Sequence, residues 1–270
     1  MKVAFIGGGN MAAAILGGLV ARGARGEDLL VVEPNAKARA KLAAEHGVNA
    51  VEAPGEELAH AEAIVLAVKP QVMREAAASI KPHVSRAVVI SIAAGIRLGD
   101  LSRWLGGYKR LVRTMPNTPA LVHAGVTGLY ADAVVSEIDR RLADTLMNAV
   151  GATVWFDKES DLDAVVAVSG SGPAYVFYAM ESLEAAAREL GLAPEKARTL
   201  ALWTFVGAAK LAIEHNEDPA KLRANVTSKG GTTERAIAVM EASYVREKIM
   251  EAVKAAAQRS RELGDEFGKD

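Results

Sequence analysis

The N-terminal segment restricts the fold of this chain more than any other. A short apolar run, Val3–Ile6, leads into a glycine turn and then into an uncharged helical pattern, Met11–Ala21. The turn matches G-x-G-x-x-A, in which the first glycine permits a tight turn, the second lets a ligand approach the backbone, and the small last residue lets the helix pack close to the strand. Its residues are Gly7, Gly8, Gly9, Asn10, Met11 and Ala12. A strand, glycine turn and helix in this order predict the first unit of a doubly wound α/β domain.

The first half of the chain continues this alternation of strands and helices. Its apolar runs show little polar alternation, as expected for parallel strands buried on both faces. The predicted strands are Val3–Ile6, Leu29–Val32, Ile64–Val68, Val88–Ile92, Leu111–Met115, Val126–Tyr130 and Thr153–Phe156, and helices are expected at Met11–Ala21, Ala36–His46 and Arg97–Leu105. We therefore expect a Rossmann-type, doubly wound parallel sheet over residues 1–158.

Residues 159–270 differ from the first half, because the sequence predicts no strand after Asp161. Glycine and proline divide this part into helices, with Pro194 and Pro219 suited to first turns and Gly191 to a helix end. The expected helices are Ala174–Leu190, Pro194–His215, Pro219–Ala224, Thr233–Glu241 and Val245–Leu263. Apolar side chains are numerous for so short a region, among them Leu183, Leu190, Leu200, Trp203, Phe205, Val206 and Leu211. Either a self-contained bundle or a half-bundle completed by a second chain would bury them, and we expect the second, an all-α dimerisation domain.

Composition argues against several classes of function. With 32 Lys and Arg against 33 Asp and Glu, the net charge of −1 gives no reason to expect nucleic acid or an anionic membrane as a partner. The chain has no cysteine, and its 5 histidines include no i, i+4 pair, so neither a disulfide scaffold nor a metal site is expected. Val3–Ala21 carries no charge, but its glycines and Asn10 do not suit a membrane span or a signal peptide. A cytoplasmic protein is expected.

The glycine turn predicts a site for a nicotinamide dinucleotide, because a helix N-terminus offers N–H groups to the pyrophosphate. Glu33 ends the second strand, where an acidic group binds the ribose 2′-hydroxyl. A carboxylate there repels a 2′-phosphate, so the residues favour NADH, although Asn35 and Lys37 could soften this preference. The alternatives are a glycine turn without a ligand and a Glu33 side chain that points into solvent.

Further lining residues should follow the next strands, because ligands of open parallel sheets bind beyond the carboxyl ends of the strands. The segments concerned are 68–70, 91–95 and 115–119, although the last could be only a rigid connector. The predicted cofactor-binding residues are Gly7, Gly8, Gly9, Asn10, Met11, Ala12, Glu33, Val68, Lys69, Pro70, Ala93, Ala94 and Asn117.

Two glycine-containing segments interrupt the helical half, at 169–175 and 227–234. In the second, Gly230 and Gly231 relax the backbone, a threonine then caps a helix, and Glu234 falls close to a capping-box position. Free N–H groups at this helix start could hold a carboxylate, and threonine hydroxyls could bond to a ring nitrogen. Spacing alone leaves a plain helix cap as an equal alternative.

Four linked motifs resemble those of the pyrroline-5-carboxylate reductase family. They are Met-Pro-Asn-Thr-Pro (115–119), Ser-Gly-Ser-Gly-Pro-Ala-Tyr (169–175), Gly-Ala-Ala-Lys (207–210) and Thr-Ser-Lys-Gly-Gly-Thr-Thr (227–233). The N-terminal segment and Ser91–Gly95 agree, so the resemblance runs nearly end to end. It implies reduction of the C=N bond of 1-pyrroline-5-carboxylate to L-proline by NADPH or NADH, the last step of proline biosynthesis. It also implies a homodimer with interleaved helical domains. In many members of the family such dimers assemble further into a decamer.

The resemblance also assigns site residues by position. The glycine turn would bind the pyrophosphate and Glu33 would lie by the adenine ribose, with Val68, Lys69, Ala94 and Asn117 near the nicotinamide half. The implied substrate-binding residues are Glu159, Asn225, Val226, Ser228, Gly231, Thr232 and Thr233. Thr233 matches the hydroxyl that the family places against the ring nitrogen, which makes it the predicted catalytic residue. No metal ligands are implied.

Two positions depart from the family pattern. Many members carry a small hydroxyl residue, or a nearby arginine, where this chain has Glu33, which puts the family's usual preference for NADPH in question. Lys229 replaces a common proline, a change that affects the rigidity of the loop more than its chemistry.

Two other functions stay open at this point. A β-hydroxyacid dehydrogenase pairs the same kinds of domain but needs a lysine in a G-x-G-x-x-x-K helix start. Counted from Gly170 and Gly172, that position is Val176, which argues against this class. The other alternative is a non-catalytic NAD(P)H-binding protein, against which the intact substrate segment counts.

Overall fold

The computed structural model describes residues 1–269 and contains one sheet of eight strands in the order β3-β2-β1-β4-β5-β6-β7-β8. The strands are β1 (Val3–Ile6), β2 (Leu29–Val32), β3 (Asn49–Val51), β4 (Ala63–Leu66), β5 (Val88–Ser91), β6 (Leu111–Met115), β7 (Gly125–Ala131) and β8 (Gly151–Trp155). From β1 the chain builds outward to β3 and then returns to the other side of β1 with β4. The switch point of this doubly wound sheet therefore lies between β1 and β4, where ligands of such folds bind.

Strands β1 to β6 are parallel, which confirms the predicted sheet for this part, but β7 is antiparallel to β6. Between Met115 and Gly125 the chain forms only the short 3-10 helix η5 (Thr118–Val122). A parallel return would need a crossover of about a dozen residues or more, so this short connection turns the chain back. Strand β8 then pairs in parallel with β7.

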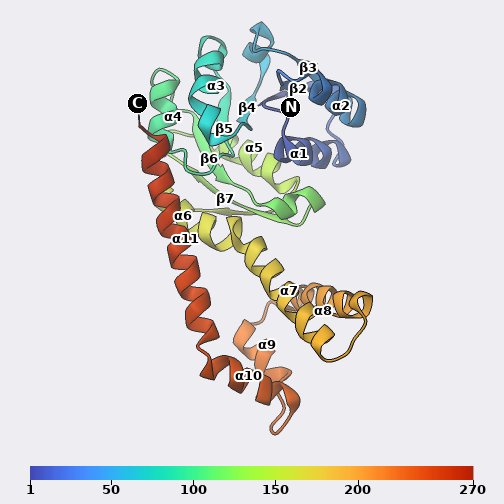
Figure 1. Cartoon of the computed structure of the whole chain (residues 1–270). Coiled ribbons are helices and arrows are strands. Elements are labelled where there is room, and N and C mark those ends of the chain that lie inside the picture. The colour runs from blue at the N-terminus through green and yellow to red at the C-terminus, as the bar shows by residue number, and fades with distance from the viewer. Residues whose placement is uncertain (270) are drawn as a thin grey trace. The chain divides into compact units, whose positions relative to one another are not determined.

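Helices cover both faces of the sheet (Figure 1). One face packs against α1 (Asn10–Ala21), α2 (Ala36–His46) and α5 (Glu137–Asn148), and the other against α3 (Met73–Ile80) and α4 (Leu98–Trp104). In β1, Val3 and Phe5 belong to the first core, and Ala4 and Ile6 to the second. Burial on both faces explains why the strands read as continuous apolar runs. The three-residue strand β3 and helices α3 and α5 were not predicted.

Gly47 ends α2 in the left-handed region, at φ 66°. Replacing Gly47 with alanine is expected to lower the free energy of unfolding by about 1 kcal/mol, because an L side chain is disfavoured there even though a Cβ would meet no other atom. Gly99, inside α4 and equally free of neighbours, is the matched control, and Gly99→Ala should leave stability unchanged or higher. Thermal unfolding of both variants tests this, and equal melting temperatures would contradict it.

Two compact units make up the chain: Met1–Ser171 together with the chain from Ala256 onward, and Gly172–Ala255. The helices after β8 are α6 (Leu162–Val165), the π-helix η7 (Val166–Gly170), α7 (Gly172–Glu189), α8 (Pro194–His215), α9 (Pro219–Asn225), α10 (Thr232–Ala242) and α11 (Val245–Phe267). These units do not coincide with the predicted domains 1–158 and 159–270. The reason is that α6 packs on the sheet, where Leu162 and Val165 occupy the space beside Gly128.

The second unit, Gly172–Ala255, has almost no core of its own. Ala197 and Ala201 are its only buried residues, whereas large side chains such as Phe177 and Trp203 are 58% and 68% exposed. No helix within residues 1–269 combines the length and apolar character that a bilayer crossing requires. Over the same residues, no group of three or more histidine or carboxylate side chains is arranged to hold a metal ion.

Candidate functional site

The glycine turn after β1 has the geometry that a dinucleotide needs. Gly7 adopts φ 98°, and a Cβ on it would lie 2.7 Å from the backbone oxygen of Ala67, so only glycine fits there. Gly9 is the N-cap of α1 without a side-chain capping bond, and a Cβ on it would meet nothing within 4 Å. No side chain caps the first N–H groups of the helix, and the open space at Gly9 leaves room for a pyrophosphate beside them.

Glu33 holds its carboxylate at the edge of this turn. Its Oε2 accepts a hydrogen bond from Gly8 N at 2.9 Å, and its Oε1 accepts one from Asn35 N, also at 2.9 Å. The alternative in which the side chain simply points into solvent is therefore wrong. A fixed negative charge beside the turn suits ribose hydroxyls and opposes a phosphate at the same place.

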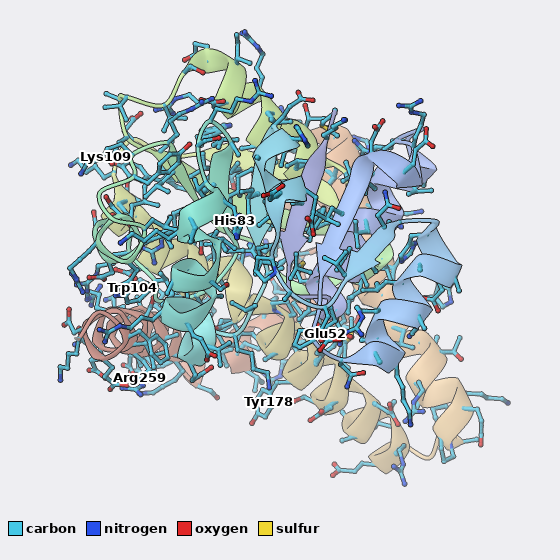
Figure 2. All side chains as sticks on the ribbon, turned by 90° about the horizontal axis from the view of Figure 1, so that it is seen from above. Glu52, His83, Trp104, Lys109, Tyr178 and Arg259 are labelled. Carbon is cyan, nitrogen blue, oxygen red and sulfur yellow. The ribbon has the colours of Figure 1, made fainter. Side chains whose placement is uncertain are left out.

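A nearby arginine is already engaged elsewhere. Arg39 Nη1 donates to the backbone oxygens of Glu33 and Pro34 at 2.7 and 2.8 Å, and its Nη2 bonds to Glu52 Oε2 at 3.1 Å. Glu52, labelled in Figure 2, directly follows β3, which is an edge strand of the sheet. Because these contacts occupy the guanidinium, Arg39 is not free in this arrangement to offset the charge of Glu33.

The carboxyl ends of β1, β4, β5 and β6 meet at one edge of the sheet, since these strands are adjacent and parallel. This brings the predicted segments after β4 and β5 to the same edge as the glycine turn. Val68 lies against the glycine turn, since its Cγ1 would be 2.9 Å from a Cβ built on Gly7. Ala93 is buried, Ala94 is half-buried and Lys69 is exposed. The predicted segments thus share one edge of the sheet, and their contact with a cofactor stays a prediction.

Asn117, at the end of β6, uses its side chain within the protein. Its Nδ2 donates to the backbone oxygen of Ser169 at 3.0 Å, and its Oδ1 accepts from Val126 N at 2.9 Å. The amide therefore links β6 to β7 and to the π-helix η7. Sequence patterns gave no sign of this π-helix, a rare form that often occurs at functional sites.

Glu159 is held by groups that sequence reasoning did not single out. Its Oε1 accepts from Leu98 N at 2.7 Å and from Arg113 Nη1 at 3.1 Å, and the Arg113 side chain is only 5% exposed. Arg113 stands within the apolar run of β6, and a charge in a strand buried on both faces was the signal that could have found it. Contact of Glu159 with a substrate stays a prediction.

The threonine-bearing loop, residues 225–233, lies in the second unit and ends at α10. Ser228 O accepts from Gly231 N at 3.0 Å across a tight turn in which Gly230 has φ 72°. Lys229 occupies the position of this turn that proline commonly takes. Glu234 Oε2 accepts from Gly230 N at 2.7 Å, so the glutamate folds back onto the turn before the helix, one residue short of the N–H that a capping box would bind.

The expected threonine cap of α10 is wrong. The N-cap is Gly231, which has no side chain to bond with the helix, and Thr232 and Thr233 stand in the first turn. Because no side chain caps it, the start of α10 keeps N–H groups that an anion can use. Asn225, Val226, Ser228 and Thr232 are exposed, and Gly231 and Thr233 are half-buried. The glycine turn and Thr233 belong to different units.

Replacing Gly7 with alanine is expected to raise the Kd for a reduced nicotinamide nucleotide by about tenfold or more, since it adds backbone strain and a clash with Ala67. Gly23→Ala is the control, because Gly23 also has a positive φ, 93°, but lies just beyond the C-terminal end of α1 with nothing within 4 Å of a Cβ, and this variant should bind the nucleotide as the wild type does. Fluorescence titration measures both. Equal affinities for the Gly7 variant and the wild type would contradict the role given to this turn.

Comparisons with known proteins identify relatives for both halves. Residues 159–263 match the family model described as pyrroline-5-carboxylate reductase dimerisation, and residues 2–95 match NADP oxidoreductase coenzyme F420-dependent. A pyrroline-5-carboxylate reductase of Pseudomonas aeruginosa is 44% identical over 99% of this chain and 98% of the relative. The structure of a pyrroline-5-carboxylate reductase from Coxiella burnetii has a TM-score of 0.93 at 40% identity, covering 97% of this chain and 98% of that one. A Plasmodium falciparum pyrroline carboxylate reductase with NADP bound has a TM-score of 0.85 at 32% identity, covering 98% of both chains.

Proposed function

The chain belongs to the pyrroline-5-carboxylate reductase family, and from this membership we propose that it reduces the C=N bond of 1-pyrroline-5-carboxylate to L-proline. It is an NAD(P)H-dependent oxidoreductase of proline biosynthesis. The observation that carries this proposal is the 44% identity over 99% of the chain, which includes both the glycine turn and the threonine-bearing loop. Neither a β-hydroxyacid dehydrogenase nor a non-catalytic binding protein accounts for a match of this extent.

The residues of the first unit would hold the cofactor. The N–H groups at the start of α1 would bind the pyrophosphate, and Glu33 would accept hydrogen bonds from the adenine ribose. When bound, the reduced nicotinamide supplies the hydride that reduces the imine carbon. Open space at Gly9 and the neighbouring strand ends of β4 and β5 support this arrangement.

The loop of the second unit would hold the substrate. The uncapped N–H groups at Gly231–Thr233 would bind its carboxylate, and the Thr233 hydroxyl would bond to the ring nitrogen as it becomes an amine. An imine accepts hydride well when its nitrogen is protonated, and we infer that the substrate arrives partly protonated. Catalysis would then come mainly from positioning and from hydrogen bonds that strengthen as charge on the nitrogen changes.

We further propose that the preferred cofactor of this chain is NADH. A carboxylate at Glu33, fixed by Gly8 N and Asn35 N, supports this preference. The engagement of Arg39 with Glu52 and two backbone oxygens supports it as well, because a free arginine could have bound a 2′-phosphate. The NADP-bound relative from Plasmodium falciparum shows that the family also accommodates the phosphorylated cofactor.

A homodimer formed by the second unit is also proposed, with the decamer of many family members as the higher assembly. The support is the family model for dimerisation and the near absence of buried residues among 172–255. Helices α7 and α8 expose Phe177, Leu200 and Trp203, which a second copy would cover. Light scattering measures the assembly directly.

One assay tests the activity. Purified protein is mixed with NADH or NADPH and either 1-pyrroline-5-carboxylate or a small oxo acid, and nucleotide oxidation is followed. Oxidation with the cyclic imine alone is expected. Oxidation with oxo acids instead would favour a β-hydroxyacid dehydrogenase, and no oxidation with any substrate would favour a binding protein.

A further inference from the structure

The last turns of α11 lie against the loop that follows β5. This loop, 92–97, carries Ala93 and Ala94 and turns at Gly95, which adopts φ 76°. A Cβ built on Gly95 would lie 3.0 Å from Cδ2 of Phe267 and 3.5 Å from Cβ of Leu263. The aromatic ring of Phe267 therefore rests directly on the turn of the loop. Figure 1 shows these C-terminal turns, in red, beside α4.

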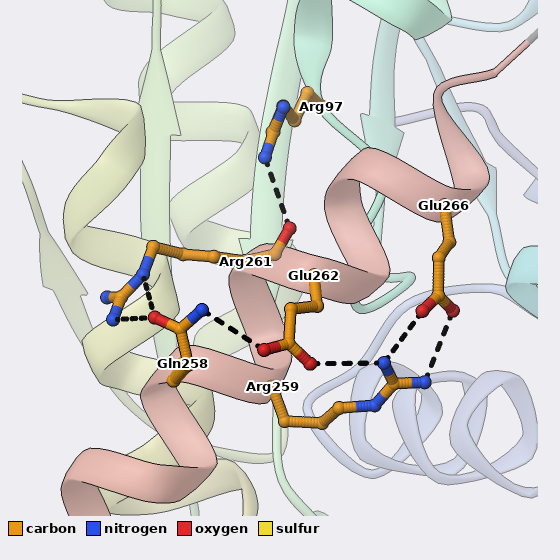
Figure 3. A network of polar contacts seen from close by, with 6 residues as sticks. All are labelled: Arg97, Gln258, Arg259, Arg261, Glu262 and Glu266. Carbon is orange, nitrogen blue, oxygen red and sulfur yellow. Dashed lines mark hydrogen bonds and ion pairs between the residues drawn. The ribbon is translucent and has the colours of Figure 1, made fainter.

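Polar contacts fix the end of the loop to the same helix. Arg97 Nη2 forms an ion pair with Asp265 Oδ1 at 2.7 Å. It also donates to the backbone oxygen of Arg261 at 3.3 Å, the bond that Figure 3 shows. Gly264 is buried, and a Cβ on it would lie 3.0 Å from Arg97 Nη2. The glycine thus lets the guanidinium lie close along the helix.

Residues on another element hold the loop where it enters α4. Leu98 N, the first N–H of that helix, donates to Glu159 Oε1, which also accepts from the buried Arg113. Three neighbouring positions, Gly95, Arg97 and Leu98, are therefore held by residues far away in sequence. A loop secured this closely has its conformation set before any ligand binds.

The helix end is itself well anchored. Ser260 is buried and donates to Asp163 Oδ1 at 2.7 Å, which ties α11 to the segment after β8. Phe267 packs on the apolar core that contains Ala93, Ile96 and Leu98. Trp104 packs on this core too, and Figure 2 shows it on the side of the sheet where Arg259 of α11 lies.

We propose that Phe267 is a positioning residue for the nicotinamide half of the cofactor site. By packing on Gly95 it holds Ala93 and Ala94 in the conformation that receives the ring. Without the aromatic side chain, the loop would sample more conformations, because its turn depends on a glycine with positive φ. Ordering the loop would then cost more conformational entropy when the nucleotide binds, and the affinity would fall. The adenine half is built on β1 and β2, from the glycine turn and Glu33, and should be unaffected. The inference rests on the proposed nicotinamide site.

The test compares two kinds of ligand on the full chain carrying Phe267→Ala. Fluorescence titration gives the Kd for NADH and NADPH, and calorimetry gives the Kd for ADP-ribose and its 2′-phosphate, which lack the nicotinamide ring. We expect the Kd for the reduced nucleotides to rise about tenfold, while the Kd for the ring-free ligands stays within about twofold of the wild type. An unchanged Kd for NADH and NADPH, or an equal rise for both kinds of ligand, overturns the proposal.

Arg259→Ala is the matched control on the same turns of α11. Arg259 bonds to Glu262 and Glu266 on the exposed side of the helix, away from the loop, and these hydrogen bonds raise its pKa. This variant should bind every ligand as the wild type does, and selective loss of NADH affinity in it would also contradict the proposal.

If Phe267→Ala does not fold, Asp265→Ala takes its place, because Asp265 is 67% exposed and its loss removes one of the two polar contacts between Arg97 and the helix. A rise of about threefold, again confined to the reduced nucleotides, is then expected. The proposed function is tested separately, because none of these affinities is measured with the imine. If that function is wrong, the wild type will not reduce the imine.

Discussion

Replacing Thr233 with alanine is expected to lower kcat for imine reduction by about 100-fold, the usual loss when one well-placed hydrogen-bonding group of an active site is removed. The hydroxyl stands in the first turn of α10, and in the proposed arrangement it bonds to the ring nitrogen of a substrate whose carboxylate the neighbouring N–H groups bind. Its bond strengthens as the nitrogen becomes an amine, so its loss should affect kcat more than the KM for the imine. Steady-state kinetics at saturating nucleotide measures both constants.

Two comparisons make this result specific. Thr233→Ser keeps the hydroxyl and should retain most of the activity, whereas Thr232→Ala, one residue earlier and exposed, should lose much less. The Kd for NADH should be the same in all three variants, because the cofactor residues lie in the other unit. Full turnover in Thr233→Ala would remove this hydroxyl from the mechanism.

The sheet was predictable because its strands are buried on both faces, which produces continuous apolar runs such as Val3–Ile6 and Ile64–Val68. The site edge followed from the same pattern, since parallel strands bring their carboxyl ends together. Strand β3 escaped prediction because it is three residues long and begins with Asn49. The direction of β7 depended on the length of the connection after Met115, which apolar periodicity does not report.

The contacts that hold the candidate site in place could not be predicted from sequence patterns. Glu159 and Leu98 are 61 residues apart, and Phe267 reaches Gly95 from the other end of the chain. Such contacts depend on how finished elements pack, whereas sequence patterns report local conformation. The threonine cap failed for a local reason: Gly230 and Gly231 together complete the turn, so the helix begins one residue earlier than Thr233 and is capped by glycine.

The apolar helices of the second half led to a correct expectation of helices and to the proposal of a partner. In the structure, α8 has the predicted bounds, Pro194–His215, yet only Ala197 and Ala201 are buried in it. A helix that keeps Trp203 68% exposed lacks the packing that normally stabilises a helix. The apolar composition of this helix thus agrees with the proposed second copy.

Replacing Glu33 with serine is expected to change the ratio of kcat/KM for NADPH over NADH by about 100-fold in favour of NADPH, which corresponds to about 2.7 kcal/mol. Removal of the carboxylate ends its repulsion of the 2′-phosphate and also removes an acceptor for the ribose hydroxyls of NADH. The first effect raises kcat/KM for NADPH and the second lowers kcat/KM for NADH. The ratio of the two therefore changes more than either value alone. Steady-state kinetics with both nucleotides at one ionic strength gives the ratio.

Charge and shape can be separated at this position. Glu33→Gln removes the charge but keeps an oxygen for Gly8 N or Asn35 N, so it should show the relief of repulsion with less damage to the turn. Glu45→Gln, which removes a negative charge that pairs with Lys41 on the exposed surface of α2, is the control and should change the ratio much less. If Glu33→Ser leaves the ratio unchanged, then the adenine ribose does not bind beside Glu33, and the cofactor preference must depend on other residues at the carboxyl edge of the sheet.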